Sequence, residues 1–205
     1  IVTGDWSSDV CSSDLSPSKN YDFISRICDV GADGIMVPMI KDAAEASNII
    51  SYIKYPPIGK RGVALGIAHD NYLRDDTPVY KRLELSNKKT TFFALIETKE
   101  GAKNANEIAS LKEVDCLWVG HFDLSASLGI PGQFDHPEYK ESLNKIIKAA
   151  KNNNKSLGRL VTSPEEGSID LDLGFDFCCF ETDTSIYQKA LISGINKIRK
   201  IVNER

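Results

Sequence analysis

The stretch FFALIETKEG, residues 92–101, decides the fold, because it places an apolar run, an acid and the start of a helix in direct succession. Five apolar residues, Phe92 to Ile96, are long enough for a buried strand, and Glu97 follows them at once. An unpaired carboxylate at the end of a buried strand loses much of its hydration. Glu97 is therefore expected either to be capped by a neighbour or to have a function.

A second stretch, VDCLWVGHFDLSASLG at residues 114–129, has the same construction. Its apolar run from Cys116 to Val119 ends at Gly120, and Asp123 follows shortly after. The segment between the two runs, residues 98–113, has the pattern of a helix. Together they predict a strand, helix, strand unit with an acid beyond the end of each strand.

The rest of the chain alternates in the same way. Helices are expected over residues 18–30, 41–55, 77–86, 99–111, 137–153, 163–173 and 185–203, and strands over residues 34–40, 92–96, 115–119, 157–161 and 176–180. Short apolar strands that alternate with amphipathic helices indicate an α/β fold, a parallel sheet covered by helices. No linker or internal repeat interrupts the pattern, which predicts one domain over residues 16–205.

The first fifteen residues do not share this pattern. IVTGDWSSDVCSSDL repeats Ser-Ser-Asp, and the segment 5–15 resembles a one-frame translation of a common sequencing-library adapter. We expect residues 1–15 to be non-native and the biological sequence to start near Ser16, having lost what preceded it. The alternative is a natural polar tail.

Composition restricts the class of protein. The chain has 205 residues, of which 41% are hydrophobic and 26% charged, and its net charge is −4. A broad nucleic-acid footprint is not expected at this charge, and no apolar run has the ~18 residues of a membrane span. There are five cysteines, and the four with apolar neighbours, Cys28, Cys116, Cys178 and Cys179, are expected to be reduced core residues of a cytoplasmic protein.

The two acids suggest a metal site. Reactive groups of parallel α/β folds gather at the carboxyl ends of the strands, where Glu97 and Asp123 are both expected. Two carboxylates without a Cys or His cluster suit Mg²⁺ or Mn²⁺, which prefer oxygen ligands. The alternative is a pair of solvated or salt-bridged loop acids, with Glu97 paired to Lys99.

Five motifs in this order, GADGIMVPMI, YPPIGKRGV, LIETKEGAKNANEIA, VGHFDLSASLG and HPEY, resemble the HpcH/HpaI family of pyruvate-dependent class II aldolases. The resemblance covers the chain from about Ser16 and implies a TIM-type (β/α)₈ barrel, of which this chain would hold about five of eight strands, the fourth to the eighth. It also implies that Glu97 and Asp123 are ligands of Mg²⁺ or Mn²⁺, with Co²⁺ as an alternative.

The resemblance implies a reaction as well, the reversible aldol cleavage of a 4-hydroxy-2-oxoacid to pyruvate and an aldehyde. The backbone amides of Gly120, His121 and Phe122 would hold the pyruvate carboxylate, and Arg61 matches a family segment near the site. A surface ion pair is an equal alternative for Arg61. The general-base His and a pyruvate-binding Arg are expected upstream of residue 16, so the chain as given should be inactive. His121 is a weak substitute for that base, and a packed or solvent-facing imidazole is the alternative.

Two other functions stay open. Relatives in the wider superfamily include CoA-ester lyases of the citrate lyase β-subunit and malyl-CoA lyase type, and a noncatalytic barrel used for assembly is the structural alternative. The last helix carries Ile186, Leu191, Ile195, Ile198 and Val202, more apolar residues than a terminal helix needs to cover its own barrel. We expect a homo-oligomer that packs through this helix.

Overall fold

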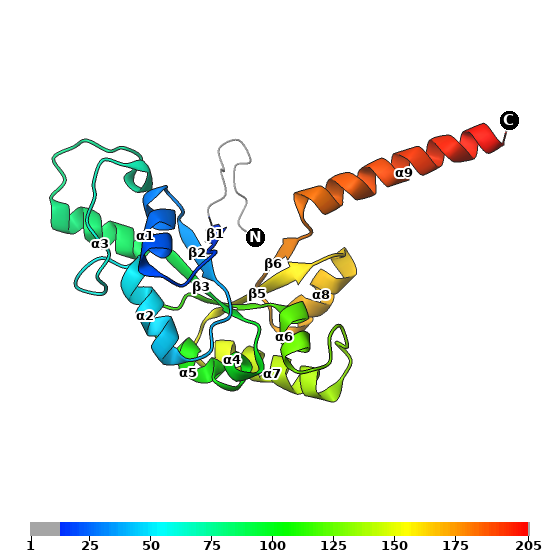
Figure 1. The fold of residues 1–205 in the computed structure, drawn as a ribbon, viewed down its shortest axis with the longest axis horizontal. Helices are drawn as coiled ribbons and strands as arrows, with labels where there is room; N and C mark the ends of the chain where they lie inside the picture. The colour runs from blue at the N-terminus through cyan, green and yellow to red at the C-terminus, as the bar shows by residue number, and fades with distance from the viewer. Residues whose placement is uncertain (1–12, 205) are drawn as a thin grey trace.

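The computed structural model describes residues 13–204, and Figure 1 shows them as a curled sheet with helices on its outer side. The sheet is parallel throughout the described residues, and the six strands found there lie in the order in which they occur in the chain. They are β1 (Ser13–Leu15), β2 (Gly34–Val37), β3 (Thr91–Ile96), β4 (Cys116–Val119), β5 (Ser156–Val161) and β6 (Phe177–Phe180).

The helices follow the expected alternation. They are α1 (Tyr21–Asp29), α2 (Ala43–Ile53), α3 (Val79–Lys89), α4 (Lys99–Lys103), α5 (Ala105–Ser110), α6 (His121–Ser127), α7 (Pro137–Asn152), α8 (Pro164–Leu173) and α9 (Asp183–Asn203), with a 3₁₀ turn at Ala68–Asp70. The α/β class and the five expected strands are confirmed, and the sheet forms a curled half-barrel. Within the described residues β1 and β6 are its two edges.

Three differences from the sequence-based expectation concern elements. The single helix expected over 99–111 is two helices, which meet at Asn104, whose side chain donates to the Lys41 carbonyl. The helix α6 was not expected. The strand β1 lies in the segment interpreted as non-native, and it adds a short sixth strand beside β2. The other residues of that segment, 1–12, lie outside the described part of the chain.

The main core fills the space between the convex face of the sheet and the helices. Alternate residues of the strands point into it, among them Ile35, Phe92 and Leu117, and all three are fully buried. The concave face is partly covered by aromatic side chains, where the Phe177 ring lies 5.3 Å from that of Trp118. One face of the sheet is therefore packed against the helices, and the other is turned toward the inside of the curl.

The cysteine prediction is confirmed for Cys28 and Cys116, which are buried, and wrong for Cys178 and Cys179, which are exposed. Both belong to β6, which pairs only with β5 among the described strands. Apolar neighbours in the sequence therefore did not guarantee burial at this edge. The cytoplasmic location inferred from the cysteines stays a prediction. No helix within residues 13–204 is long and apolar enough to cross a membrane.

A largely buried ion pair joins α8 to β5. Arg159 Nε donates to Asp170 Oδ2 at 2.5 Å, and Asp170 is only 1% exposed. We expect Asp170→Ala to lower the free energy of unfolding by about 3–5 kcal/mol, because it leaves the mostly covered Arg159 charge without its closest partner. The matched control is Asp172→Ala, which removes an exposed acid from the same helix. Chemical denaturation measures both, and equal losses in the two variants would contradict this role.

Candidate metal and substrate site

Glu97 lies at the carboxyl end of β3, directly after the apolar run that forms this strand. Its carboxylate is buried, with 6% of the residue exposed, and its Oε1 accepts a hydrogen bond from the Met39 backbone N–H at 2.8 Å. No hydrogen bond to Oε2 is found among the described residues. The expected cap is therefore real, but it uses only one of the two carboxylate oxygens.

Asp123 follows β4, the strand next to β3, and lies in the first turn of α6. It is exposed. Burial is the largest cause of the raised pKa of Glu97, and the negative charge of Asp123 raises this pKa further, while the Met39 N–H and the charge of Lys19 lower it. Two carboxylates that repel one another at a strand end form a site that a cation would stabilise.

Gly120 separates the two acids and leaves room for Glu97. A Cβ atom at Gly120 would lie 2.4 Å from Glu97 Oε2 and 2.7 Å from Glu97 Cβ, both far inside van der Waals contact. Only a glycine allows the chain to pass this close to the carboxylate. The same residue is the N-cap of α6, so it sets both the approach to Glu97 and the turn that carries Asp123.

The amides proposed to hold a carboxylate are not all available. The Gly120 N–H donates to the Ile96 carbonyl at 3.3 Å as part of the sheet, which corrects the expectation for that amide. The amides of His121 and Phe122 are in the first turn of α6, where backbone N–H groups have no partner within the helix. No acceptor for either amide is found within residues 13–204. These two N–H groups can receive an anion.

The position of the His121 side chain does not favour the role of substitute base. It is 8% exposed and stacks beside the rings of Phe122 and Phe134, with centroid distances of 4.5 and 5.4 Å. Burial lowers the pKa of His121, and the nearby Arg159 charge lowers it further. The packed alternative describes the imidazole better than the substitute base does, because no hydrogen bond links it to Glu97 or Asp123 in the described chain. Phe122 itself is 62% exposed beside the turn.

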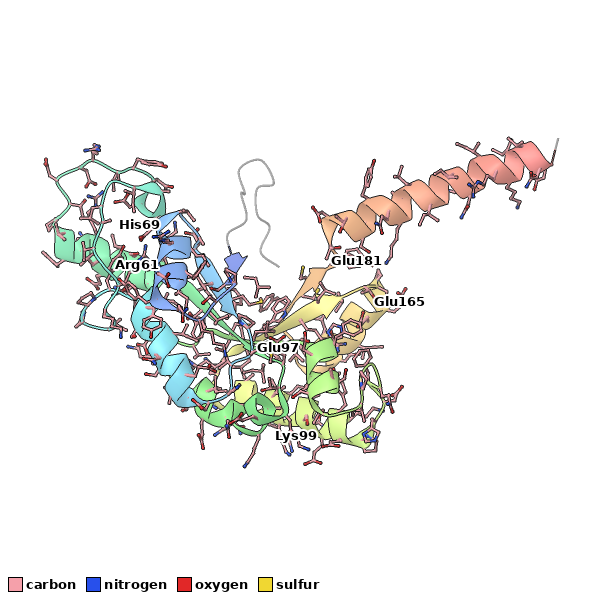
Figure 2. The ribbon with its side chains drawn as sticks, viewed as in Figure 1. Arg61, His69, Glu97, Lys99, Glu165 and Glu181 are labelled. Carbon is pink, nitrogen blue, oxygen red and sulfur yellow. The ribbon has the colours of Figure 1, made fainter. Side chains whose placement is uncertain are left out.

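Arg61 is not part of this site. Its side chain is 1% exposed, its guanidinium bonds Asp29 at 2.5 Å and it lies over the Tyr55 ring at 4.6 Å. Asp29 ends α1, which leads into the amino end of β2, whereas Glu97 lies at the carboxyl end of β3. Figure 2 shows Arg61 beside α1 and α2 and away from Glu97. The ion-pair alternative for Arg61 is therefore the one found, with the guanidinium buried and Asp29 half-buried.

Lys99 does not neutralise Glu97 either. It forms its ion pair with Glu138 at 2.8 Å, so the alternative of a simple Glu97–Lys99 pair is not realised. No cluster of three or more Cys, His, Asp or Glu side chains that could hold a metal is found within residues 13–204. The donor set is thus two carboxylates, which suits Mg²⁺ or Mn²⁺, because these ions keep several water ligands and take further oxygens from substrate.

Sequence reasoning missed one member of the neighbourhood, Lys19. Its Nζ donates to the Met39 carbonyl at 2.7 Å and to Glu45 Oε1 at 2.7 Å. The sequence could have pointed to Lys19 only if the left-handed turn at Met39, where φ is 57°, had been predicted. Methionine gives no signal for a left-handed backbone.

Comparisons with known proteins identify the family to which the sequence is similar. A sequence model of the family described as HpcH/HpaI aldolase/citrate lyase matches residues 15–178. The chain is similar to the 2-keto-3-deoxy-L-rhamnonate aldolases of Klebsiella pneumoniae, with 29% identity over 84% of this chain, and of Salmonella paratyphi B, with 28% identity over 87%. It spans 63% and 66% of the length of these two relatives.

The comparison with solved structures finds proteins of the same family. A solved HpcH/HpaI aldolase/citrate lyase family protein from Burkholderia cenocepacia superposes with a TM-score of 0.83 and 25% identity. The match covers 91% of this chain and 73% of that one.

Proposed function

Because the chain belongs to the HpcH/HpaI aldolase/citrate lyase family, we propose that its full-length protein is a metal-dependent carbon–carbon lyase. The reaction would be the reversible aldol cleavage of a 4-hydroxy-2-oxoacid to pyruvate and an aldehyde. The observation that carries the proposal is the pair Glu97 and Asp123, which follow neighbouring strands, beside two amides that have no acceptor within the described residues. The aldolase names of the relatives support the same reaction class.

Glu97 and Asp123 would hold the divalent cation, Mg²⁺ or Mn²⁺. When bound, the cation would supply Lewis-acid stabilisation of the negative charge that develops on the keto oxygen during cleavage. The buried Glu97 fits this role because its Oε2 accepts no hydrogen bond from another group of the described chain. The Asp123 charge also repels the Glu97 carboxylate, and a cation between the two would neutralise this repulsion.

The turn after β4 would orient the substrate. The N–H groups of His121 and Phe122 would donate to the carboxylate of the oxoacid, while the partial positive charge of the first helical turn favours the anion. Cleavage breaks the bond between C3 and C4, turns the C4 hydroxyl into an aldehyde and leaves C3 to gain a proton as the methyl group of pyruvate. A base must take the C4 hydroxyl proton. We propose that this base, like a pyruvate-binding Arg, comes from sequence outside residues 16–205.

A substrate assay tests the reaction class. A 2-keto-3-deoxy sugar acid carries its hydroxyl on C4 and is therefore a 4-hydroxy-2-oxoacid, which makes 2-keto-3-deoxy-L-rhamnonate a suitable probe. We expect the full-length protein to release pyruvate from it in the presence of Mg²⁺ or Mn²⁺ and to stop when a chelator is added. Cleavage of acyl-CoA substrates alone would favour a CoA-ester lyase, and no turnover of either class would favour a noncatalytic barrel.

We also propose a homo-oligomer that packs through α9. No residue of α9 is buried, and Figure 1 shows the helix leaving the rest of the protein. Its apolar residues Ile186, Leu191, Ile195, Ile198 and Val202 are 46–63% exposed. A row of this kind is costly in water unless it is covered by a partner.

The assembly prediction is tested with charges on this row. We expect the double variant Leu191→Glu, Ile195→Glu to dissociate the oligomer, because burying two glutamates in an apolar contact is unfavourable. Asn196→Glu, a charge added at a polar position of the same helix, should leave the mass unchanged. Light scattering measures both. A monomeric mass for the unmodified full-length protein at micromolar concentration would contradict the proposal.

A further inference from the structure

The turn between β2 and α2 has an unusual backbone. Met39 adopts the left-handed conformation, with a φ of 57°, and its side chain is 42% exposed. This conformation is unfavourable for a residue with a long side chain, and it persists only where surrounding contacts hold it. The Met39 side chain is not packed in the core, so these contacts must come from its backbone.

Both backbone polar groups of Met39 are held by charged side chains. Its N–H donates to Glu97 Oε1 at 2.8 Å, and its carbonyl accepts from Lys19 Nζ at 2.7 Å. Lys19 and Glu97 thus bond the two backbone polar groups of the same residue. The residue that follows, Ile40, is fixed as well, because its N–H donates to the Leu95 carbonyl at 3.2 Å.

Lys19 is itself positioned. Its Nζ donates to Glu45 Oε1 at 2.7 Å, and Glu45 Oε2 accepts from the Lys41 N–H at 2.9 Å. Glu45 lies in the first turn of α2, where its backbone N–H is capped by the Asp42 side chain. The side chains of Lys19 and Glu45 are each 28% exposed, so water screens this pair less than a surface pair. The ammonium group is thereby tied to the start of a helix.

We propose that Lys19 is a positioning residue: together with Glu45 it holds Met39 in the left-handed turn, and through the Met39 N–H it fixes the Glu97 carboxylate. The effect on metal binding rests on the proposed function, but the effect on the turn does not. A side chain that orients a metal ligand from outside the coordination sphere typically changes metal affinity by ~10- to 100-fold. Lys19 acts one peptide group further away, through the backbone.

The first measurement is hydrogen–deuterium exchange of residues 34–41 in the metal-free full-length protein. We expect Lys19→Met to speed exchange of the Met39 amide at least about tenfold, because loss of the carbonyl bond frees the turn and weakens the N–H bond to Glu97. Lys41→Met removes a positive charge from the same segment without removing a side-chain hydrogen bond of the described structure, and should exchange like the unmodified protein. Glu45→Gln should change the exchange in the same direction as Lys19→Met and by less.

The second measurement is Mn²⁺ binding by calorimetry, with thermal unfolding as a check on folding. Lys19→Met should weaken Mn²⁺ binding by ~10- to 100-fold, whereas Lys19→Arg, which can still donate to the Met39 carbonyl, should recover part of it. Unchanged Met39 exchange in Lys19→Met and Glu45→Gln would overturn the positioning role. If the unmodified protein binds no Mn²⁺, the proposed function fails, and the exchange result alone decides the role of Lys19. If Lys19→Met does not fold, the Glu45→Gln exchange decides it.

Discussion

Glu97→Gln and Asp123→Asn are each expected to abolish turnover of a 4-hydroxy-2-oxoacid by the full-length protein while leaving it folded. Each change replaces a charged oxygen ligand with a neutral amide and keeps the side-chain volume. The loss should exceed the ~10- to 100-fold that is typical when an outer-sphere partner of a metal is removed, because these groups would bind the cation directly. Pyruvate release after chelation and addition of Mg²⁺ or Mn²⁺ measures the effect.

The control for this pair is Glu100→Gln. Glu100 is an exposed acid in the first turn of α4, three residues after Glu97. Replacing it with glutamine changes the net charge by the same amount as Glu97→Gln. We expect nearly full activity from it. Undiminished turnover in either Glu97→Gln or Asp123→Asn, after the same chelation, would remove these two residues from the mechanism.

Gly120→Ala is the second change with a large expected effect. The new methyl group would meet Glu97 Oε2 at 2.4 Å, so the carboxylate or the β4 turn must move. A misplacement of about 1 Å at a reacting centre can cost ~10²-fold in rate, and we expect a loss of at least this size together with weaker Mn²⁺ binding. The strand ladder is intact up to Val119, so most of the fold should remain.

A matched glycine distinguishes a local effect from a general one. At Gly167, in α8, a Cβ atom would meet only Val161 Cγ2, at an ordinary 3.8 Å. Gly167→Ala should therefore retain activity and metal affinity, and it should not lower the melting temperature, because alanine favours a helix over glycine. If Gly120→Ala bound Mn²⁺ as tightly as the unmodified protein, the close approach to Glu97 would have no functional meaning.

The pattern of apolar runs was enough to predict most of the fold. The strands that end at Ile96 and Val119 are short, apolar and followed by acids, and a parallel sheet necessarily brings their carboxyl ends together. The positions of Glu97 and Asp123 followed from this rule. The helix α6 was missed because it is only seven residues long and follows Gly120, in a segment with the composition of a loop.

What the sequence did not predict depends on contacts between distant segments. Arg61 stands in a motif of the family, but its placement depends on Asp29, which is 32 residues away in the chain. The bonds of Lys19 and Glu97 to Met39 span 20 and 58 residues, and they depend on a backbone conformation that no residue type at this position signals. The exposure of Cys178 depends on β6 being an edge strand of the described sheet, which its apolar composition does not reveal.

The central claim is that Glu97 and Asp123 together hold a divalent cation that also binds the oxoacid. A crystal structure of the full-length protein with Mn²⁺ and pyruvate, with anomalous diffraction data, tests it most directly. We predict one anomalous peak within coordination distance of both carboxylates, with the pyruvate carboxylate facing the N–H groups of His121 and Phe122. A Mn²⁺ peak that neither Glu97 nor Asp123 contacts, or pyruvate bound at another place, would contradict the account.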